Sequence, residues 1–217
     1  MTTPERMDAF FAERVNGYDE HMLTEVEGCR EGYAEMARRI PAGVKNLLDL
    51  GCGTGLELDA ILPRFPDLSV TGIDLTQEML DALKRKHPDR NLTLVCGDYF
   101  TVPFGTDAYD CVVSFETMHH FPPQEKQKLY EKILAALHPG GCYIECDYMV
   151  DTPEEEAALF AQSDRLRREN ALKDGELYHI DTPCCIEHQL QLLTAAGFAR
   201  VEHVFRMGGT SLSVASK

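Results

Sequence analysis

Apolar residues follow two patterns that alternate along most of the chain. Short apolar runs are typical of buried strands, and stretches in which apolar residues recur every three or four positions are typical of helices. The runs predict strands at residues 44–50, 68–74, 92–96, 111–115 and 142–145. Helical spacing follows the first, second and fourth of these runs. Strands separated by helices indicate parallel βαβ units, and hence a doubly wound sheet with ligands at the carboxyl ends of its strands.

The alternation of strand and helix patterns ends toward the C-terminus. The helix predicted at 124–137 ends at the Pro-Gly-Gly sequence 139–141. Near the end, two β-like runs at 199–206 and 210–215 are joined by two glycines, which predicts an antiparallel hairpin. We therefore predict one α/β domain, residues 1–217, with a mostly parallel seven-stranded sheet, a C-terminal antiparallel hairpin and helices on both faces.

Two helical segments stand outside the βα units. In residues 4–40, helical spacing predicts one helix up to about Asn16 and a second from position 22 to position 40. In residues 151–180, Thr152 is placed to cap a helix that begins with Pro153. We interpret the first segment as an N-terminal cap and the second as a lid-like insertion, although a solvated connector is the alternative for the second. We expect the two segments together to form the roof of a pocket. The apolar residues expected in this roof are Phe10, Tyr33, Met118, Met149, Phe160 and Tyr178.

Charge and composition exclude several kinds of partner. The formal net charge is −15, whereas binding to long nucleic acid needs clustered Lys and Arg. No apolar run approaches the roughly 20 residues that span a bilayer, and the first six residues lack the apolar core of a signal peptide. We expect a cytoplasmic protein without a membrane or nucleic-acid partner, and the sequence leaves the oligomeric state open.

The eight cysteines are scattered along the chain, and several lie inside predicted strands. In a reducing compartment such cysteines serve as small buried apolar residues. The pair Cys184-Cys185, with His179 and His188 nearby, matches zinc-finger spacing poorly. We therefore expect no metal site.

A glycine-rich turn follows the first strand. It consists of Gly51, Cys52, Gly53, Thr54 and Gly55 and leads directly into a helix. Glycine tolerates positive φ and lets a ligand lie against the backbone, so the turn suggests a nucleotide-sized ligand. The spacing alone also fits a dinucleotide-binding fold, or a turn that binds nothing.

Six short stretches follow one another in a recognisable order: 49–55, 72–80, 96–99, 109–115, 118–121 and 137–141. Together they resemble the motifs of the class I S-adenosylmethionine-dependent methyltransferases, and the resemblance covers roughly residue 44 to the C-terminus. The resemblance implies a small-molecule methyltransferase that converts S-adenosylmethionine to S-adenosylhomocysteine by direct displacement at the sulfonium methyl. Several motifs in one order are more specific than any single motif.

The resemblance also implies a cofactor site. Asp74 would accept hydrogen bonds from both ribose hydroxyls, Asp98 would hold the adenine amino group, and Asp49 would face the methionyl ammonium. Taken singly, each acid also fits a turn or a cap. The expected cofactor-binding residues are Tyr18, Asp49, Gly51, Cys52, Gly53, Thr54, Gly55, Asp74, Leu75, Met79, Gly97, Asp98, Tyr99 and Phe115.

Candidate catalytic groups follow the fourth predicted strand. Much of the catalysis of methyl transfer comes from aligning the acceptor with the methyl group, and a base helps when the acceptor is a hydroxyl or an amine. Glu116, His119 and His120 are the candidates for this base, and a purely structural role for the histidines is the alternative. Tyr18 resembles a family tyrosine that closes over the cofactor.

Three other functions stay open at this stage. The chain could methylate RNA or protein, or bind S-adenosylmethionine without catalysis as a sensor or scaffold. A nicotinamide oxidoreductase is disfavoured by Asp49 and by the terminal hairpin, which dinucleotide-binding domains do not need.

Overall fold

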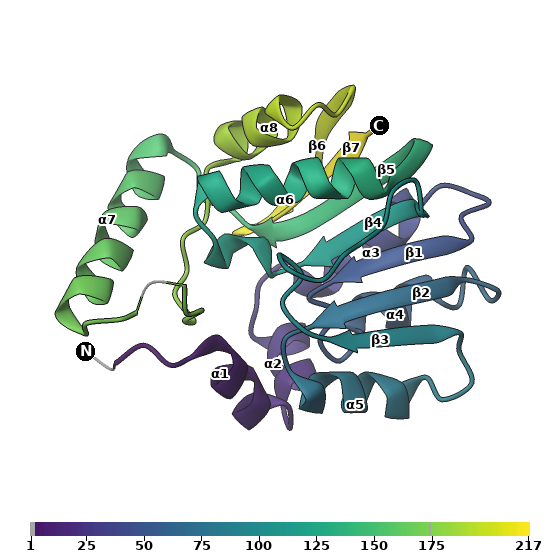
Figure 1. Ribbon diagram of the computed structural model, residues 1–217, viewed down its shortest axis with the longest axis horizontal. Coiled ribbons are helices and arrows are strands. Elements are labelled where there is room, and N and C mark those ends of the chain that lie inside the picture. The colour runs from purple at the N-terminus through teal and green to yellow at the C-terminus, as the bar shows by residue number, and fades with distance from the viewer. Residues whose placement is uncertain (1–2, 174) are drawn as a thin grey trace.

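The computed structural model describes residues 3–173 and 175–217. Its seven strands form one sheet in the order β3-β2-β1-β4-β5-β7-β6 (Figure 1). Strands β1 to β5 are parallel, and β7 is antiparallel to both β5 and β6. The strands are β1 (Asn46–Leu50), β2 (Ser69–Asp74), β3 (Leu92–Cys96), β4 (Tyr109–Phe115), β5 (Leu137–Tyr148), β6 (Arg200–Met207) and β7 (Thr210–Ser216). The predicted fold class is confirmed.

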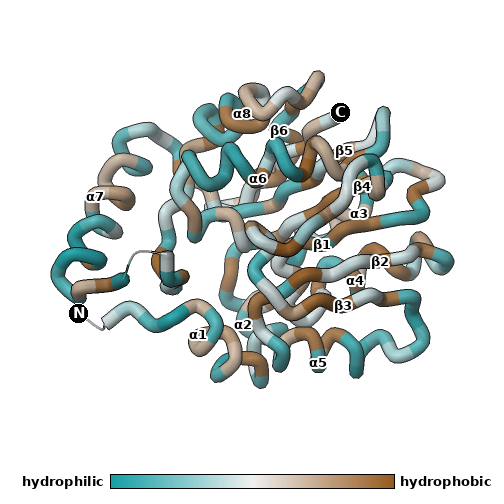
Figure 2. The backbone as a smooth tube through the Cα atoms, in the orientation of Figure 1, coloured by the Kyte–Doolittle hydropathy of each residue, from teal (hydrophilic) through white to brown (hydrophobic). Residues whose placement is uncertain are grey.

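Helices cover both faces of the sheet. The core on one face involves α3, α4 and α5, and the core on the other involves α6 and α8. Figure 2 shows the apolar positions gathered in the strands and a mainly hydrophilic α7 at the side of the molecule. The helices are α1 (Met7–Arg14), α2 (Tyr18–Thr24), α3 (Cys29–Arg39), α4 (Leu56–Ile61), α5 (Gln77–Lys86), the 3-10 helix η1 (Met118–His120), α6 (Pro123–Ala136), α7 (Pro153–Glu169) and α8 (Ile186–Ala195).

The N-terminal helices differ from the prediction at one point. The expected helix from position 22 to position 40 is broken into α2 and α3, and Gly28 at the break has a φ of 86°. A Cβ atom on Gly28 would lie 2.5 Å from the backbone oxygen of Met207 in the terminal hairpin. The break therefore lets the chain pass closely under that hairpin, which is a tertiary contact that helical spacing does not reveal.

Strand β5 begins earlier than predicted. The sequence 139–141, expected to follow the helix as a turn, lies within β5. The pairing with β4 is irregular between the pairs Tyr109–Leu137 and Cys111–Cys142, and Gly140 has a φ of 82°. A bulge thus absorbs the glycines without ending the strand.

The helix α7 begins as predicted. The backbone amide of Glu155 donates to the Thr152 hydroxyl at 3.2 Å, and the amide of Thr152 donates to the Glu155 carboxylate at 3.3 Å. This reciprocal pair is a capping box. Among the residues that the structure describes, no helix is long and apolar enough to cross a membrane.

Candidate active site

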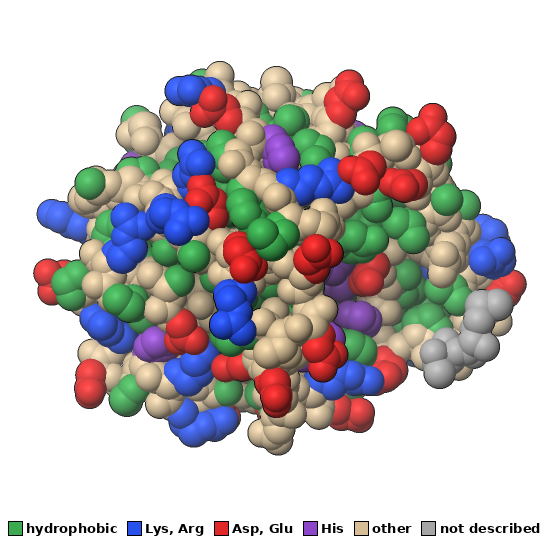
Figure 3. Space-filling view, turned by 180° about the vertical axis from the view of Figure 1, so that it is seen from behind, with side chains coloured by type: hydrophobic (Ala, Val, Ile, Leu, Met, Phe, Trp, Pro, Cys, Tyr) green, Lys and Arg blue, Asp and Glu red, His purple; other side chains and the backbone are tan. Residues whose placement is uncertain are grey.

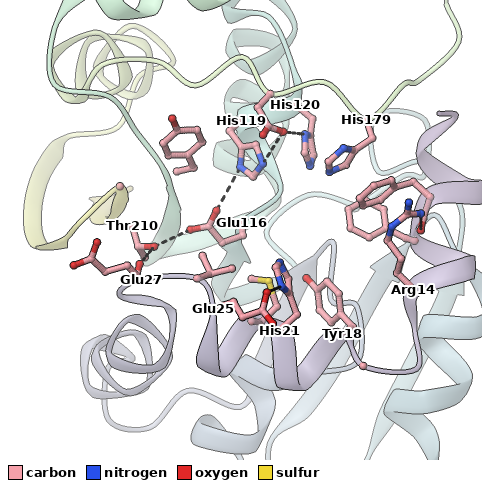
Figure 4. Close-up of a pocket in the computed structure, with 18 of the residues that line it drawn as sticks. Arg14, Tyr18, His21, Glu25, Glu27, Glu116, His119, His120, His179 and Thr210 are labelled. Carbon is pink, nitrogen blue, oxygen red and sulfur yellow. Dashed lines mark hydrogen bonds and ion pairs between the residues drawn. The ribbon is translucent and has the colours of Figure 1, made fainter. Parts of the chain in front are cut away.

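A cavity of about 850 Å³ lies at the carboxyl ends of β4 and β5, where Glu116 and Tyr148 line it. Its walls come from α1, α2, the end of β4, η1 and the segment that follows α7. Figure 4 shows His119, His120 and His179 on one side of this cavity, Arg14, Tyr18 and His21 on the other, and Glu116 at one end beside His119 and Thr210. The predicted cap and the predicted catalytic groups therefore meet in one cavity, which we call the main cavity.

The glycine turn lies beside the main cavity. Gly51, Gly53 and Gly55 all have positive φ, at 69°, 47° and 80°. A Cβ atom on Gly51 would lie 2.7 Å from the Thr117 hydroxyl oxygen, whereas the nearest side chain to a Cβ on Gly53 is the Tyr18 ring at 3.9 Å. Side chains thus leave space next to the Gly53 backbone, close to Tyr18, the first residue of α2.

Gly55 of the turn can be compared with Gly43, which precedes β1 and has a similar φ. Gly43 has a φ of 88° and open space where its Cβ would stand, while a Cβ on Gly55 would collide with Leu83. We expect Gly43→Ala to lower the free energy of unfolding by about 1 kcal/mol through backbone strain, and Gly55→Ala to lower it by about 2–4 kcal/mol through strain and overpacking. Urea unfolding measures both, and equal losses would contradict this packing.

Asp74, at the end of β2, fastens the glycine turn. Its carboxylate accepts hydrogen bonds from the backbone amides of Gly53 at 2.9 Å and Thr76 at 2.8 Å. Burial raises the pKa of Asp74 to about 6, and these two hydrogen bonds limit the rise. A carboxylate can accept further hydrogen bonds, so both oxygens remain able to bind a ligand.

Asp49, in β1, is fully buried beside Glu57 of α4. Neither oxygen of Asp49 has a hydrogen-bond partner among the described residues, and Oε1 of Glu57 has none either. Burial raises the pKa of Asp49 to about 7 and that of Glu57 well above its usual value, so this coupled pair retains a proton near neutral pH. Two buried carboxyls without other partners are costly unless a shared proton or a cation lies between them.

Six of the predicted cofactor residues surround a second, small cavity of about 50 Å³. They are Gly51, Asp74, Leu75, Gly97, Asp98 and Tyr99. Met7 and Phe11 of α1 lie against the same space, and Phe11 also lines the main cavity. The Tyr99 hydroxyl lies 3.0 Å from the Thr117 hydroxyl, and Asp98 accepts a hydrogen bond from the Phe100 amide at 2.8 Å.

Other predicted cofactor residues have structural contacts instead. Cys52 is buried, and its sulfur would lie 2.8 Å from a Cβ on Gly72 in β2. Phe115 stacks on Tyr33 in the core with ring centroids 3.8 Å apart. The Thr54 hydroxyl donates to Asp19 of α2, and Met79 is buried on α5. These four side chains line neither of the two cavities described above.

The roof of the main cavity differs from the expectation. Of the six apolar residues expected there, Phe10 lines this cavity. Tyr33, Met118 and Met149 are instead buried in the body of the protein and do not line this cavity. Phe160 and Tyr178 line a separate cavity of about 500 Å³ next to α6 and α7. The helix α7 itself does not line the main cavity. The segment after it does, through His179 and Asp181.

The catalytic candidates form a network of acids and imidazoles. His119 Nδ1 lies 2.8 Å from Oδ1 of Asp147 and 3.6 Å from Oε2 of Glu116. Burial lowers the pKa of His119, but the neighbouring carboxylates, Asp147 above all, raise it to about 9. Burial raises the pKa of Glu116 to about 7, and its backbone has a φ of 48°. Such a conformation in a non-glycine residue is often found at functional sites.

The segment after α7 completes this network. Asp181 Oδ1 lies 3.3 Å from His120 Nδ1 and 3.6 Å from His119 Nε2. Burial lowers the pKa of His120 to about 4. His179 stacks on Phe10 of α1 with ring centroids 3.6 Å apart.

Sequence reasoning missed Asp147 and Asp181, and it considered His179 only beside the Cys184-Cys185 pair. Asp147 lies within a long strand, and the two others lie in an irregular segment about 60 residues from the histidine pair. No spacing along the chain connects them to residues 116–120. Strand-end position, the signal that located Asp74, could at best have drawn attention to Asp147, near the carboxyl end of β5.

Comparison with known proteins points to a family. Residues 47–141, a little under half of the chain, match the family model described as a methyltransferase domain. This match, together with the relatives and solved structures described below, supports a class I S-adenosylmethionine-dependent methyltransferase domain in these residues. S-adenosylmethionine is the cofactor of this class. The matched range includes the glycine turn, Asp74, Asp98 and residues 116–120, so the methyltransferase domain holds most of the predicted site.

Two curated proteins and one solved structure are similar to this chain. Carboxy-S-adenosyl-L-methionine synthase of Chromohalobacter salexigens is 29% identical over 186 residues, which cover 79% of this chain and 68% of the synthase. A fatty-acid O-methyltransferase of Mycolicibacterium smegmatis is 29% identical over 129 residues, 58% of this chain and 46% of that enzyme. Human N-acetylserotonin methyltransferase, solved in complex with S-adenosylmethionine, superposes with a TM-score of 0.69 at 18% identity, over 97% of this chain and 56% of that one. The structural likeness establishes the fold.

Proposed function

We propose that this domain transfers the methyl group of S-adenosylmethionine to a small molecule bound in the main cavity. The observation that carries the proposal is the position of Tyr18, whose ring lies over Gly53 of the glycine turn and also lines the main cavity. A cofactor site and an acceptor site would then meet at this residue. The cavity of about 850 Å³ is within the range that small-molecule ligands occupy.

The residues present fit the cofactor. Asp49, buried without a partner beside Glu57, would attract the methionyl ammonium, and Asp74 and Asp98 would bind the ribose and the adenine amino group. Leu75 and Tyr99 would contact the adenine face. We propose that Cys52, Thr54, Met79 and Phe115 act indirectly, by shaping the turn and the strands. When bound, the cofactor supplies an electrophilic methyl group on a sulfonium.

The acceptor would meet the acids and imidazoles of the main cavity. Glu116 lines the main cavity beside His119 and would accept the proton that a hydroxyl or ammonium loses on methylation (Figure 4). His119, fixed by Asp147, and His120 would orient the acceptor. The cap formed by α1 and α2 would exclude water from this space. Of the predicted lid, residues 151–180, only the last part lines the main cavity, through His179. We propose that this part covers the acceptor.

Observations on charge weigh against RNA as the acceptor. The formal net charge is −15, and Glu116 and Asp181 line the main cavity. On the face shown in Figure 3, Lys and Arg side chains are interspersed with acids and form no continuous basic patch. A small molecule fits these features better than a polyanion does. The free cysteines are consistent with a cytoplasmic location, which we also propose.

Turnover separates this proposal from a non-catalytic binding protein. The full chain is incubated with S-adenosylmethionine and a panel of small hydroxyl, amine and thiol compounds, and S-adenosylhomocysteine formation is measured. We expect formation that depends on one class of acceptor. Binding of the cofactor without consumption against every class would favour a sensor or scaffold, and consumption only with RNA or protein would favour a macromolecular methyltransferase.

The affinity for S-adenosylhomocysteine is expected to rise with pH. Below about pH 7, Asp49 of the cofactor-free protein holds a proton that must leave before an ammonium can bind. For one proton, the dissociation constant should fall up to about tenfold per pH unit below this pKa and level off above it. Titration calorimetry in two buffers of different ionisation enthalpy measures both the affinity and the proton release. Proton uptake, or an affinity that does not vary with pH, would contradict the role of Asp49.

A further inference from the structure

Two histidines and an aspartate converge at the wall of the main cavity. Nε2 of His119 and Nδ1 of His120 lie 3.6 and 3.3 Å from the same oxygen of Asp181, and the three ligand atoms lie within 4.8 Å of one another (Figure 4). The ligands of a tetrahedral ion with bonds of about 2.0–2.1 Å are about 3.4 Å apart. The two nitrogen–oxygen distances are close to that separation.

The groups around this cluster hold it in place. Asp147 Oδ1 lies 2.8 Å from Nδ1 of His119, which leaves Nε2 directed at Asp181. Carboxylates in this position commonly orient histidine ligands of metals. The amide and hydroxyl of Thr182 both donate to the backbone oxygen of His119, at 2.7 and 3.1 Å, and so fasten the segment that carries Asp181 to η1.

The histidine side chains are also buried. The side chain of His120 is 3% exposed, and within the described part of the chain its Nδ1 contacts Asp181 Oδ1 at 3.3 Å without the alignment of a hydrogen bond. A buried nitrogen without an aligned hydrogen bond is costly, and a ligand at this position would remove that cost. The Asp181 side chain is 47% exposed and lines the main cavity, so an ion bound here would be open on that side.

We propose that His119, His120 and Asp181 bind one divalent transition-metal ion, of the zinc or iron(II) kind, at the wall of the main cavity. Imidazole nitrogens combined with one carboxylate suit these ions better than magnesium, which prefers oxygen ligands. Three protein ligands leave coordination positions for an oxygen or nitrogen of the acceptor. Binding of the ion does not depend on the proposed function, although its use in holding an acceptor does.

A second cluster in the molecule is a poorer metal site. Ligand atoms of Glu156, Cys184 and His188 also lie close together. Both oxygens of Glu156 are engaged, one by His188 Nδ1 at 2.5 Å and the other by the Cys185 amide at 2.7 Å. The Lys126 ammonium lies 3.6 Å from the Cys184 sulfur and already supplies a positive charge there. This cluster therefore serves as the matched control.

Metal titration of the tag-free full chain tests the proposal. After chelator treatment and dialysis, zinc is titrated calorimetrically, and we expect one site per chain with a dissociation constant of about 1 μM or lower. The double variant His120→Ala/Asp181→Asn should lose at least about 100-fold in affinity, whereas Cys184→Ser/His188→Ala should keep it. S-adenosylhomocysteine binding should persist in both double variants, which separates this test from that of the cofactor site.

Cobalt(II) provides a readout that needs no variant. Cobalt in the proposed site should show visible ligand-field bands without a thiolate charge-transfer band, because the site contains no sulfur. Absence of zinc binding by the native chain, unchanged binding by His120→Ala/Asp181→Asn, or a thiolate band would each overturn the proposal. Should the double variant fail to unfold cooperatively on heating, the cobalt spectrum of the native chain decides.

Discussion

Asp49→Asn is expected to weaken S-adenosylhomocysteine binding about 100-fold and, at the same time, to stabilise the cofactor-free protein. Removing the charge that faces a buried ammonium costs about 2–5 kcal/mol of binding, and 100-fold corresponds to about 2.7 kcal/mol. The opposite effect on stability arises because Asp49 is buried without a hydrogen-bond partner among the described residues. An amide of the same shape carries no charge to bury, and it can donate to the neighbouring Glu57 carboxyl.

The pH dependence of the stability gain follows from the sign of the pKa shift. Folding raises the pKa of Asp49 from its usual value near 3.8 to about 7, so the stability associated with its proton is lost as the pH rises through 7. Asp49→Asn avoids this loss. We expect its melting temperature to exceed that of the native chain by about 3 °C at pH 8 and by less as the pH falls toward 5.

Calorimetric titration and scanning calorimetry on the same samples measure the two effects. The matched control is Asp67→Asn, because Asp67 is an exposed acid just before β2, at the end of the sheet opposite the glycine turn. It should change neither binding nor stability. A loss of binding together with a loss of stability in Asp49→Asn would mean that Asp49 has a structural role, and unchanged binding would remove it from the cofactor site.

Glu116→Gln is expected to lower turnover about 100-fold while leaving S-adenosylhomocysteine affinity within about twofold, because a general base contributes roughly 10²–10⁴ to the rate. Glutamine keeps the shape of the side chain and can still contact the Thr210 hydroxyl, which lies 3.2 Å from Oε1 of Glu116. It cannot take a proton from the acceptor at neutral pH. Initial rates with saturating cofactor, alongside calorimetric titration, separate the two quantities.

The control for this substitution is Glu125→Gln on the exposed surface of α6, which should retain full turnover. Unchanged turnover in Glu116→Gln would mean that alignment of the acceptor suffices and that no carboxylate base takes part. Loss of cofactor affinity in the same variant would instead place Glu116 in the cofactor site.

Much of the fold was accessible from the sequence because its elements carry local signals. Alternating strand and helix patterns locate the five parallel strands, and Gly208-Gly209 between two β-like runs locates the hairpin. The departures come from contacts between distant elements. Gly28 breaks a helix because the terminal hairpin passes close to it, and β5 continues through Gly140 because a bulge accommodates the glycine.

The candidate site was accessible only in part, for a related reason. Asp74 and Asp98 follow neighbouring parallel strands, so topology alone brings them to the same edge of the sheet. Whether a side chain faces the site or the core depends on the local turn, and Cys52 and Phe115 face the core. Asp181 reaches the site through an irregular segment whose path no periodicity encodes. The functional roles of all these residues stay predictions.

A crystal structure of the full chain with S-adenosylhomocysteine tests the central proposal most directly. We expect the amino group of the ligand at Asp49, its ribose at Asp74, its adenine beside Leu75 and Asp98, and its sulfur directed into the main cavity toward Glu116. A ligand bound elsewhere, or one whose sulfur is separated from the main cavity by protein, would contradict the account.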